Sequence, residues 1–277
     1  MNKTRFNVMR KIVAGLLLLG SISLISMSFI PQKKKVTTLY LIGDSTVADY
    51  TDYDGEDYLN TRYPVTGWGQ MFQPFMRPDS LSKIRQLIKT DSVVVADKAR
   101  GGRSTRTFFE EGRWATVYNE LKKNDVVMIQ FGHNDAAENK PERYVNIQGY
   151  KEFLRLFVNQ TREKGGIPIL LTPVARNYPW KDGKLTNVHG DYPQAVKEVA
   201  KELHVYLLDL NQLSMDAFTA KGEAFVTEHY FMNLPVGKYK AYPEGQKDNT
   251  HFQQEGGKAV AQLVFNGMKQ LKLPQAK

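Results

Sequence analysis

The sequence predicts an α/β fold built on a parallel, doubly wound sheet. Short apolar, β-branched runs alternate with longer amphipathic stretches, and each run ends in polar or glycine-rich sequence. Strands that alternate with helix-length segments are typical of right-handed crossover connections, which bury a parallel sheet between helices. The length of 277 residues, with 42% hydrophobic and 24% charged residues, fits one globular domain.

The individual elements follow from local periodicity. The predicted strands are the apolar runs at 36–42, 93–96, 126–131, 167–171 and 205–208. The predicted helices, whose apolar residues recur at helical spacing, are 150–164, 192–203 and 254–271. The first of these helices ends at Gly165-Gly166, as expected of a glycine stop. A stretch rich in Tyr, Asp, Gly and Pro at 49–79 predicts a long loop with helical turns, and loops of this length are commonly functional.

The N-terminus carries a predicted targeting segment. Four basic residues precede an apolar run at 12–30, and Ser26-Met27-Ser28 offers a small-x-small cleavage site. We expect residues 1–30 to be a signal peptide, with an uncleaved N-terminal anchor as the alternative, because the run is just long enough to span a membrane. The functional domain is then 34–277. The predicted location is secreted or periplasmic, or at the membrane through residues 12–30.

Composition restricts the chemistry. The chain has no cysteine, which excludes a thiol nucleophile, a zinc–thiolate site and a disulfide framework. Residues 1–30 hold four basic and no acidic residues, so their removal lowers the net charge from +9 to +5. This mildly basic balance fits an acidic substrate and gives no indication of a nucleic-acid partner. We expect a monomer.

The most informative stretch is Gly43-Asp44-Ser45-Thr46, which ends the first predicted strand abruptly. A tight turn there places Ser45 at the carboxyl end of a strand, where parallel α/β sheets bind their ligands. The alternative is that these residues cap a following helix, since Asp, Ser and Thr satisfy free N–H groups at helix starts.

Two further strands end in residues that could bind an oxyanion. Gly101-Gly102 follows the second strand, and a glycine lets a backbone N–H approach a ligand closely. Gly132-His133-Asn134-Asp135 follows the third, where the Asn134 amide is a candidate donor. A phosphate-binding loop is an alternative for the glycine pair, although neither G-x-G-x-x-G nor G-x-x-x-x-G-K-[ST] is present. A helix cap is the alternative for Asn134-Asp135.

A candidate base lies near the C-terminus, in Asp248-Asn249-Thr250-His251. A three-residue spacing across a turn lets the carboxylate of Asp248 reach one ring nitrogen of His251, which fixes the tautomer and leaves the other nitrogen free to take a proton from a serine. The competing histidines are His133, His189, His204 and His229.

These four stretches resemble the four sequence blocks of the SGNH hydrolases, the GDSL-like esterases and lipases, in order and over nearly the whole of residues 34–277. The resemblance implies a flavodoxin-like three-layer α/β/α sandwich with a five-stranded parallel sheet. It also implies a serine esterase mechanism that needs neither a metal nor a cofactor.

Finer detail resembles the rhamnogalacturonan acetylesterases, the family 12 carbohydrate esterases, which remove acetyl groups from pectic polysaccharide. The matching segments are GDST (43–46), GGRSTRTF (101–108), EEGRW (110–114), QFGHND (130–135) and DNTHF (248–252). The resemblance implies Ser45 as nucleophile, His251 as general base and then acid, and Asp248 as the orienting carboxylate. It implies an oxyanion hole of the Ser45 N–H, the Gly102 N–H and the Asn134 side chain, with Gly102 preferred over Gly101 because it directly precedes Arg-Ser.

Substrate contacts are predicted from loop aromatics and arginines. Flat rings stack on sugar faces, and guanidinium groups pair with uronate carboxylates in bidentate geometry. The candidates are Trp68, Arg103, Arg176 and Tyr178. The alternative is that the rings anchor loops on the core and that the arginines form ion pairs within the fold.

Other functions remain open at this level. Within the enzyme class, the alternatives are an acetylesterase for xylan or another acetylated glycan and a general GDSL-type esterase. The absence of a long apolar lid disfavours a lipid substrate. A non-catalytic carbohydrate-binding protein would not need Ser45, Asp248 and His251 together. A nucleotide-binding module is suggested by the parallel sheet and the glycine pair alone.

Overall fold

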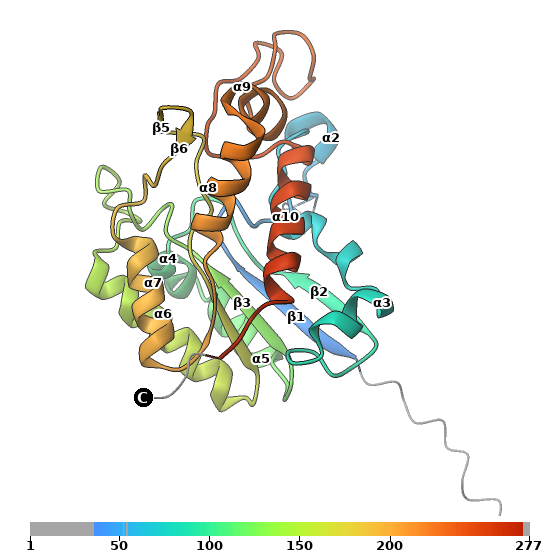
Figure 1. The fold of residues 1–277 in the computed structure, drawn as a ribbon, viewed down its shortest axis with the longest axis vertical. Helices are drawn as coiled ribbons and strands as arrows, with labels where there is room; N and C mark the ends of the chain where they lie inside the picture. Colours follow the sequence, from blue (N-terminus) through green and yellow to red (C-terminus); the bar gives the residue numbers. More distant parts are fainter. Residues whose placement is uncertain (1–35, 52, 54, 274–277) are drawn as a thin grey trace, which may run out of the picture. The chain divides into compact units, whose positions relative to one another are not determined.

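A five-stranded parallel sheet forms the centre of the fold in the computed structural model, which describes residues 36–51, 53 and 55–273 (Figure 1). The strand order is β2-β1-β3-β4-β7, and all neighbouring strands pair in parallel. This is the flavodoxin-like order 2-1-3-4-5. The strands are β1 (Thr37–Gly43), β2 (Val93–Asp97), β3 (Val126–Gln130), β4 (Ile167–Leu171) and β7 (Tyr206–Leu208).

Helices cover both faces of this sheet, because alternate strand residues point to opposite sides. On β1, Leu39 and Leu41 belong to one buried apolar cluster, and Tyr40 and Ile42 belong to the other. The first cluster includes residues of α3 (Pro78–Leu81), α8 (Leu210–Lys221) and α10 (Gln254–Met268). The second includes residues of α4 (Thr105–Glu110), α5 (Arg113–Glu120), α6 (Ile147–Glu163) and α7 (Tyr192–Glu202). Figure 1 shows α6 and α7 on one side of the sheet and α10 and α3 on the other. The predicted three-layer sandwich is confirmed.

Short elements complete the architecture. They are α2 (Tyr58–Thr61), η1 (Gly69–Met71), η2 (Gln73–Phe75), η3 (Ser82–Ile84), the hairpin strands β5 (Trp180–Lys181) and β6 (Lys184–Leu185), α9 (Glu223–Phe225) and η4 (Val226–Tyr230). The predicted loop at 49–79 contains several of these helical turns. None of the short elements extends the central sheet.

All five predicted strands are present, with ends that differ by at most one residue from the expected ones. The three predicted helices are also present, and their ends differ by up to three residues. The largest shift at a helix start is in α6, which begins at Ile147 because Asn146 caps it. The Asn146 side chain accepts a hydrogen bond from the Gly149 N–H at 2.8 Å.

Helix α8 was not predicted, and its buried face explains why. The buried residues are Leu210, Asn211, Ser214 and Phe218, so half of the face is polar and the apolar periodicity is weak. The polar members have partners in the core: the Ser214 hydroxyl donates to the Leu210 carbonyl at 2.7 Å and accepts from the Ala175 N–H at 2.9 Å. Buried polar groups in proteins usually have such hydrogen-bond partners.

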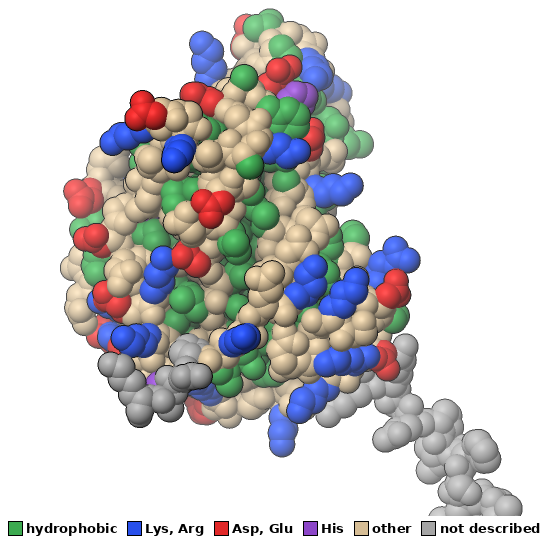
Figure 2. Space-filling model, in the orientation of Figure 1, with side chains coloured by type: hydrophobic (Ala, Val, Ile, Leu, Met, Phe, Trp, Pro, Cys, Tyr) green, Lys and Arg blue, Asp and Glu red, His purple; other side chains and the backbone are tan. Residues whose placement is uncertain are grey.

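The predicted targeting segment at 1–30 lies outside the described residues. Within the described ranges, no helix is both long and apolar enough to cross a membrane. In the same part of the chain, no group of three or more His, Asp or Glu side chains is arranged to hold a metal ion. On the molecular face that carries α8 and α10, Asp and Glu side chains lie among the Lys and Arg side chains (Figure 2).

Candidate active site

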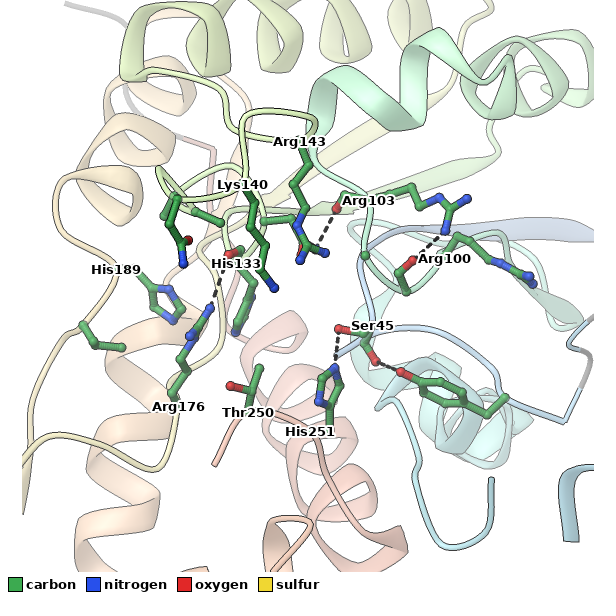
Figure 3. Close-up of a pocket in the computed structure, with 18 of the residues that line it drawn as sticks. Ser45, Arg100, Arg103, His133, Lys140, Arg143, Arg176, His189, Thr250 and His251 are labelled. Atoms are coloured by element: carbon green, nitrogen blue, oxygen red, sulfur yellow. Dashed lines mark hydrogen bonds between the residues drawn. The ribbon is translucent and has the colours of Figure 1, made fainter. Parts of the chain in front are cut away.

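A pocket of about 840 Å³ opens at the carboxyl edge of the sheet (Figure 3). Its lining includes Ser45 from the end of β1, Gly101 and Gly102 from the end of β2, Asn134 from the end of β3, and His251. The three strand-end stretches and the C-terminal Asp-x-x-His stretch singled out from the sequence therefore meet in one cavity. This is the position at which ligands bind in open α/β sheets.

A tight turn after β1 presents Ser45. The buried carboxylate of Asp44 accepts hydrogen bonds at Oδ1 from the Thr46 N–H at 2.9 Å and the Thr46 hydroxyl at 2.8 Å. Gly43 is required here because a Cβ at this position would lie 2.6 Å from the Gln130 carbonyl oxygen. No α-helix begins at this turn, so the alternative of a helix cap does not hold. The strand end and the turn together hold the serine at the pocket wall.

Three side chains form a continuous hydrogen-bonded series. The hydroxyl oxygen of Ser45 lies 2.9 Å from Nε2 of His251, and Nδ1 of His251 lies 2.6 Å from Oδ2 of Asp248. The other oxygen of Asp248 accepts hydrogen bonds from the N–H groups of Thr250 at 2.7 Å and His251 at 3.1 Å. These contacts fix the plane of the carboxylate and the ring orientation of the histidine.

The Asp248 carboxyl is held ionised. Its partial burial alone would raise its pKa, but the contact with His251 and the hydrogen bonds from the backbone N–H groups outweigh this effect and lower the pKa below its ordinary value. An ionised carboxylate against Nδ1 keeps the proton on that nitrogen. It leaves Nε2 available to accept the proton of Ser45 and stabilises the imidazolium that forms.

Backbone hydrogen bonds from two other segments fix the position of the segment that carries His251. The His251 carbonyl accepts a hydrogen bond from the Met232 N–H at 2.9 Å, and the carbonyl of buried Phe252 accepts one from the Thr66 N–H at 2.9 Å. Thr66 and Met232 lie far from His251 in the sequence. Contacts from Thr66, in the loop at 49–79, and from Met232 therefore hold the histidine opposite Ser45.

The backbone N–H groups of Ser45 and Gly102, the two predicted for the oxyanion hole, have no hydrogen-bond partner within the described residues. Gly102 has φ +80°, a left-handed conformation that favours glycine. The neighbouring Gly101 N–H donates to the hydroxyl of Tyr53 at 2.7 Å. Of the glycine pair, Gly102 is therefore the one whose N–H is available to a ligand.

Asn134 supplies a third donor. It is buried, and one N–H of its side-chain amide donates to the Arg103 carbonyl at 3.0 Å, which leaves the second N–H for a ligand. The side chain caps no helix, because the next long helix, α6, is capped by Asn146. Both the predicted oxyanion donors and the predicted nucleophile thus lie in the same pocket.

The other four histidines lack the contacts of His251. Burial lowers the pKa of His133 and, more strongly, that of His189, so both rings are neutral at pH 7. Nδ1 of His133 lies 3.2 Å from the Asp44 carboxylate behind the serine turn. His204 lies in a turn after α7 at φ 48°, and His229 lies 3.6 Å from Glu255.

The predicted substrate-binding residues divide into two groups. Arg103, Arg176 and Tyr178 line the pocket, whereas Trp68 does not. Trp68 is fully buried, and its Nε1 donates to the side chain of Gln130 at 2.8 Å. The prediction that Trp68 stacks on a sugar is therefore wrong, because the ring anchors the loop at 49–79 on the core. Arg103 is also engaged, in contacts of 3.0 Å with both oxygens of Glu111.

Sequence reasoning missed several pocket residues, four of which bear directly on the site. Tyr50 donates from its hydroxyl to the Ser45 carbonyl at 3.0 Å, and Tyr53 accepts from Gly101. Lys140 and Arg143 enter from the segment between β3 and α6. The available signal was their position in loops that follow or face a strand end, where residues of a ligand site collect.

Comparison with known proteins gives a consistent family. The model of the GDSL-like Lipase/Acylhydrolase family matches residues 41–258. Two Bacillus subtilis proteins match most of the chain. "Probable rhamnogalacturonan acetylesterase YesY" is 36% identical over 85% of this chain and 94% of its own length. Rhamnogalacturonan acetylesterase RhgT is 34% identical over 87% of this chain and 93% of its own length.

Solved structures share the fold. The Bacillus subtilis protein YxiM superposes with a TM-score of 0.67 at 27% identity, over 85% of this chain, which spans 57% of that chain. Axe2, an acetylxylan esterase from Geobacillus stearothermophilus, superposes with a TM-score of 0.52 at 18% identity, over 84% of this chain and 94% of its own. The second similarity is one of fold alone.

Proposed function

Because this chain belongs to the GDSL-like lipase/acylhydrolase family, we propose that it is a serine esterase that removes acetyl groups from pectic polysaccharide, specifically rhamnogalacturonan. One observation carries the chemistry: Ser45, His251 and Asp248 form a hydrogen-bonded series with contacts of 2.9 and 2.6 Å. A serine hydroxyl is a poor nucleophile until a neighbouring base takes its proton, and this series supplies that base.

In the first half of the reaction, the Ser45 oxygen attacks the acetyl carbonyl while Nε2 of His251 takes the hydroxyl proton. Negative charge develops on the carbonyl oxygen. The N–H groups of Ser45 and Gly102 and the free amide N–H of Asn134 then donate hydrogen bonds to it. Collapse of the tetrahedral intermediate breaks the bond to the sugar oxygen, which leaves with the proton from His251.

In the second half, water repeats the sequence. His251 takes a proton from a water molecule, the hydroxide oxygen attacks the acetyl group on Ser45, and the same three donors stabilise the second oxyanion. The proton returns to the Ser45 oxygen, and acetate leaves. The ionised Asp248 stabilises the imidazolium in both halves.

The names of the two similar Bacillus proteins support rhamnogalacturonan as the substrate. The pocket supports a polar, extended ligand. It is open at the carboxyl edge of the sheet, and its described lining is rich in Arg, His, Asn and Tyr. Tyr178, 37% exposed at the rim, is suited to stack on a sugar face.

Acetate release tests this function. Purified protein is assayed on acetylated rhamnogalacturonan, acetylated homogalacturonan and acetylated xylan, beside Ser45→Ala and the surface control Ser82→Ala. We expect release from rhamnogalacturonan by the unmodified chain and by Ser82→Ala, and a rate near background for Ser45→Ala. Release from xylan alone would reject the pectic substrate. Equal rates for Ser45→Ala and the unmodified chain would reject the serine mechanism.

We also propose that the protein acts outside the cytoplasm, because four basic residues precede the apolar run at 12–30. Fractionation of producing cells, with N-terminal sequencing of the recovered protein, tests this. A chain that starts after residue 28 in the periplasm or medium supports export and cleavage. A full-length chain in the membrane fraction supports the anchor instead, and a full-length chain in the cytoplasm rejects export.

A further inference from the structure

We propose that Lys140, Arg143 and Arg176 form a carboxylate-binding subsite beside Ser45, so that the enzyme selects acetylated glycans with a uronate at or next to the acetylated sugar. The inference rests on the esterase function proposed above. It adds a residue-level basis for choosing an acidic glycan over a neutral one.

The Lys, Arg, Asp and Glu side chains in the described pocket lining are all of one sign, positive. Six cations line the pocket, and no Asp or Glu is among its described lining residues. This differs from the surface over α8 and α10, where both signs are mixed (Figure 2). A concave wall with charges of one sign focuses the field and attracts a ligand of the opposite sign.

The six cations fall into two groups by their partners. Arg62 makes a bidentate contact with Glu56 at 2.7 and 2.9 Å, and Arg103 contacts both oxygens of Glu111 at 3.0 Å. Arg100 lies over the ring of Tyr53, with the guanidinium carbon 3.7 Å from its centroid. These three cations are already engaged in holding the loops around the serine and the glycine pair.

The second group has weaker charge compensation within the described residues. Lys140 and Arg176 have no carboxylate within ion-pair distance. Arg143 has one, its neighbour Glu142, at 3.6 Å, and the side chain of Glu142 is 68% exposed. Figure 3 shows Lys140, Arg143 and Arg176 on one side of Ser45 and Arg100 and Arg103 on the other. The uncompensated charge therefore lies on one side of the nucleophile.

Two of these guanidinium groups also have unused donors. The Nε atoms of Arg143 and Arg176 are buried and have no hydrogen-bond partner. Arg176 is fixed by its other nitrogens, which donate to the Tyr178 hydroxyl at 2.7 Å and the His133 carbonyl at 3.3 Å. A buried donor without a partner is unfavourable, and a carboxylate bound beside these guanidinium groups would offset their charge through charge-assisted contacts.

Arg143 lies close to the reacting atoms. A Cβ built on Gly102 would be 3.4 Å from Nη1 of Arg143, so the guanidinium lies beside the glycine whose N–H faces the pocket. A carboxylate bound by Arg143 is therefore adjacent to the acetyl group under attack. This proximity places the uronate on the acetylated sugar or on its direct neighbour.

The test compares one substrate pair that differs only at the uronate carboxyl group, which is either ionised or methyl-esterified. Acetylated rhamnogalacturonan oligosaccharides are assayed as the free acid and as the methyl ester of the same preparation, and kcat and KM are measured for acetate release. The ratio of the two kcat/KM values within one variant cancels any general loss of activity. The variants are Arg143→Gln, Arg176→Gln and, as a matched loss of one pocket charge, Arg62→Gln.

We expect the unmodified enzyme to prefer the free acid by about tenfold or more, mainly through KM, because a charge-assisted bidentate contact is lost in the ester. Arg143→Gln and Arg176→Gln should bring the ratio close to one, whereas Arg62→Gln should keep most of it. High salt should shrink the preference of the unmodified enzyme, a readout that does not depend on any variant folding.

Three outcomes would overturn the subsite. They are equal use of acid and ester by the unmodified enzyme, an undiminished preference in Arg143→Gln and Arg176→Gln, and a loss in Arg62→Gln as large as in Arg143→Gln. In each case acetate is still released, so the esterase function stands. Absence of acetate release from both substrates and from 4-nitrophenyl acetate would instead reject the proposed function, and the subsite with it.

Discussion

Replacement of Asp248 by Asn exchanges one carboxylate oxygen for an NH₂ group, removes the negative charge and changes the shape of the side chain very little. Oδ1 of Asp248 accepts two backbone N–H groups, from Thr250 at 2.7 Å and His251 at 3.1 Å. An asparagine must keep its carbonyl oxygen there to satisfy these donors. Its NH₂ group then faces Nδ1 of His251, where Oδ2 of Asp248 now lies at 2.6 Å.

This exchange reverses the tautomer of the histidine. Because Nδ1 then faces the NH₂ donor, Nδ1 must accept a hydrogen bond, and the ring proton moves to Nε2. The Nε2–H group then donates to the Ser45 oxygen, 2.9 Å away. A protonated Nε2 cannot take the Ser45 proton, and the imidazolium also loses its counter-charge. We expect Asp248→Asn to lower kcat by about 10³ to 10⁴-fold, or about 4 to 5.5 kcal/mol of transition-state stabilisation.

The assay is hydrolysis of 4-nitrophenyl acetate and of acetylated rhamnogalacturonan, with thermal unfolding as a check that the variant is folded. Asp216→Asn is the matched control, because Asp216 is exposed and accepts a hydrogen bond from the side chain of Gln212. The control should retain full activity. A folded Asp248→Asn enzyme with kcat within tenfold of the unmodified one would refute the assigned role of the carboxylate.

Three further substitutions test the oxyanion hole, the structural role of Trp68 and the titration of Asp135. Gly102→Ala should lower kcat by tenfold or more, because φ is +80° and the added methyl would meet Arg143 at 3.4 Å; an unchanged kcat would contradict this. Trp68→Phe should lower the free energy of unfolding in urea by about 1 to 3 kcal/mol, by leaving Gln130 without a donor, with no change in KM. Burial raises the pKa of Asp135 to about 7, so the folded state holds a proton that the unfolded chain releases from about pH 4 upward. Stability should therefore fall as pH rises through this window, and Asp135→Asn should remove this part of the fall in urea titrations near pH 4 and pH 8.

The sheet and the Ser-His-Asp series were accessible from sequence because both are locally encoded. Each strand is a continuous apolar run, which reads clearly when a parallel strand is buried on both faces. Ser45 follows such a strand directly, and Asp248 and His251 are three residues apart in one turn. The topology then brings the strand ends together without further information.

The substrate-facing residues were less accessible, because exposure is decided by distant parts of the chain. Trp68 and Tyr178 both lie in loops rich in aromatic residues, yet the first is buried against Gln130 and the second lies at the pocket rim. Arg103 is engaged by Glu111, which directly follows α4, whereas Arg143 has only a longer contact of 3.6 Å with exposed Glu142. No local pattern distinguishes these cases.

Polar contributions to the core were missed for a related reason. Helix α8 buries Asn211 and Ser214, whose partners Pro173 and Ala175 follow β4. Tyr53 supports the glycine pair from the loop at 49–79 through its hydroxyl. Apolar periodicity carries no signal for contacts made by hydrogen bonds between segments far apart in sequence.

In the proposed mechanism, Ser45 carries the acetyl group between the two halves of the reaction. Rapid acid quench of the enzyme with 4-nitrophenyl acetate, followed by proteolysis and mass spectrometry, tests it directly. We expect one added acetyl group on the peptide that contains Ser45 and none on the same peptide from the Ser45→Ala variant. An acetyl group on another residue that turns over at the catalytic rate, or undiminished turnover by Ser45→Ala, would contradict it.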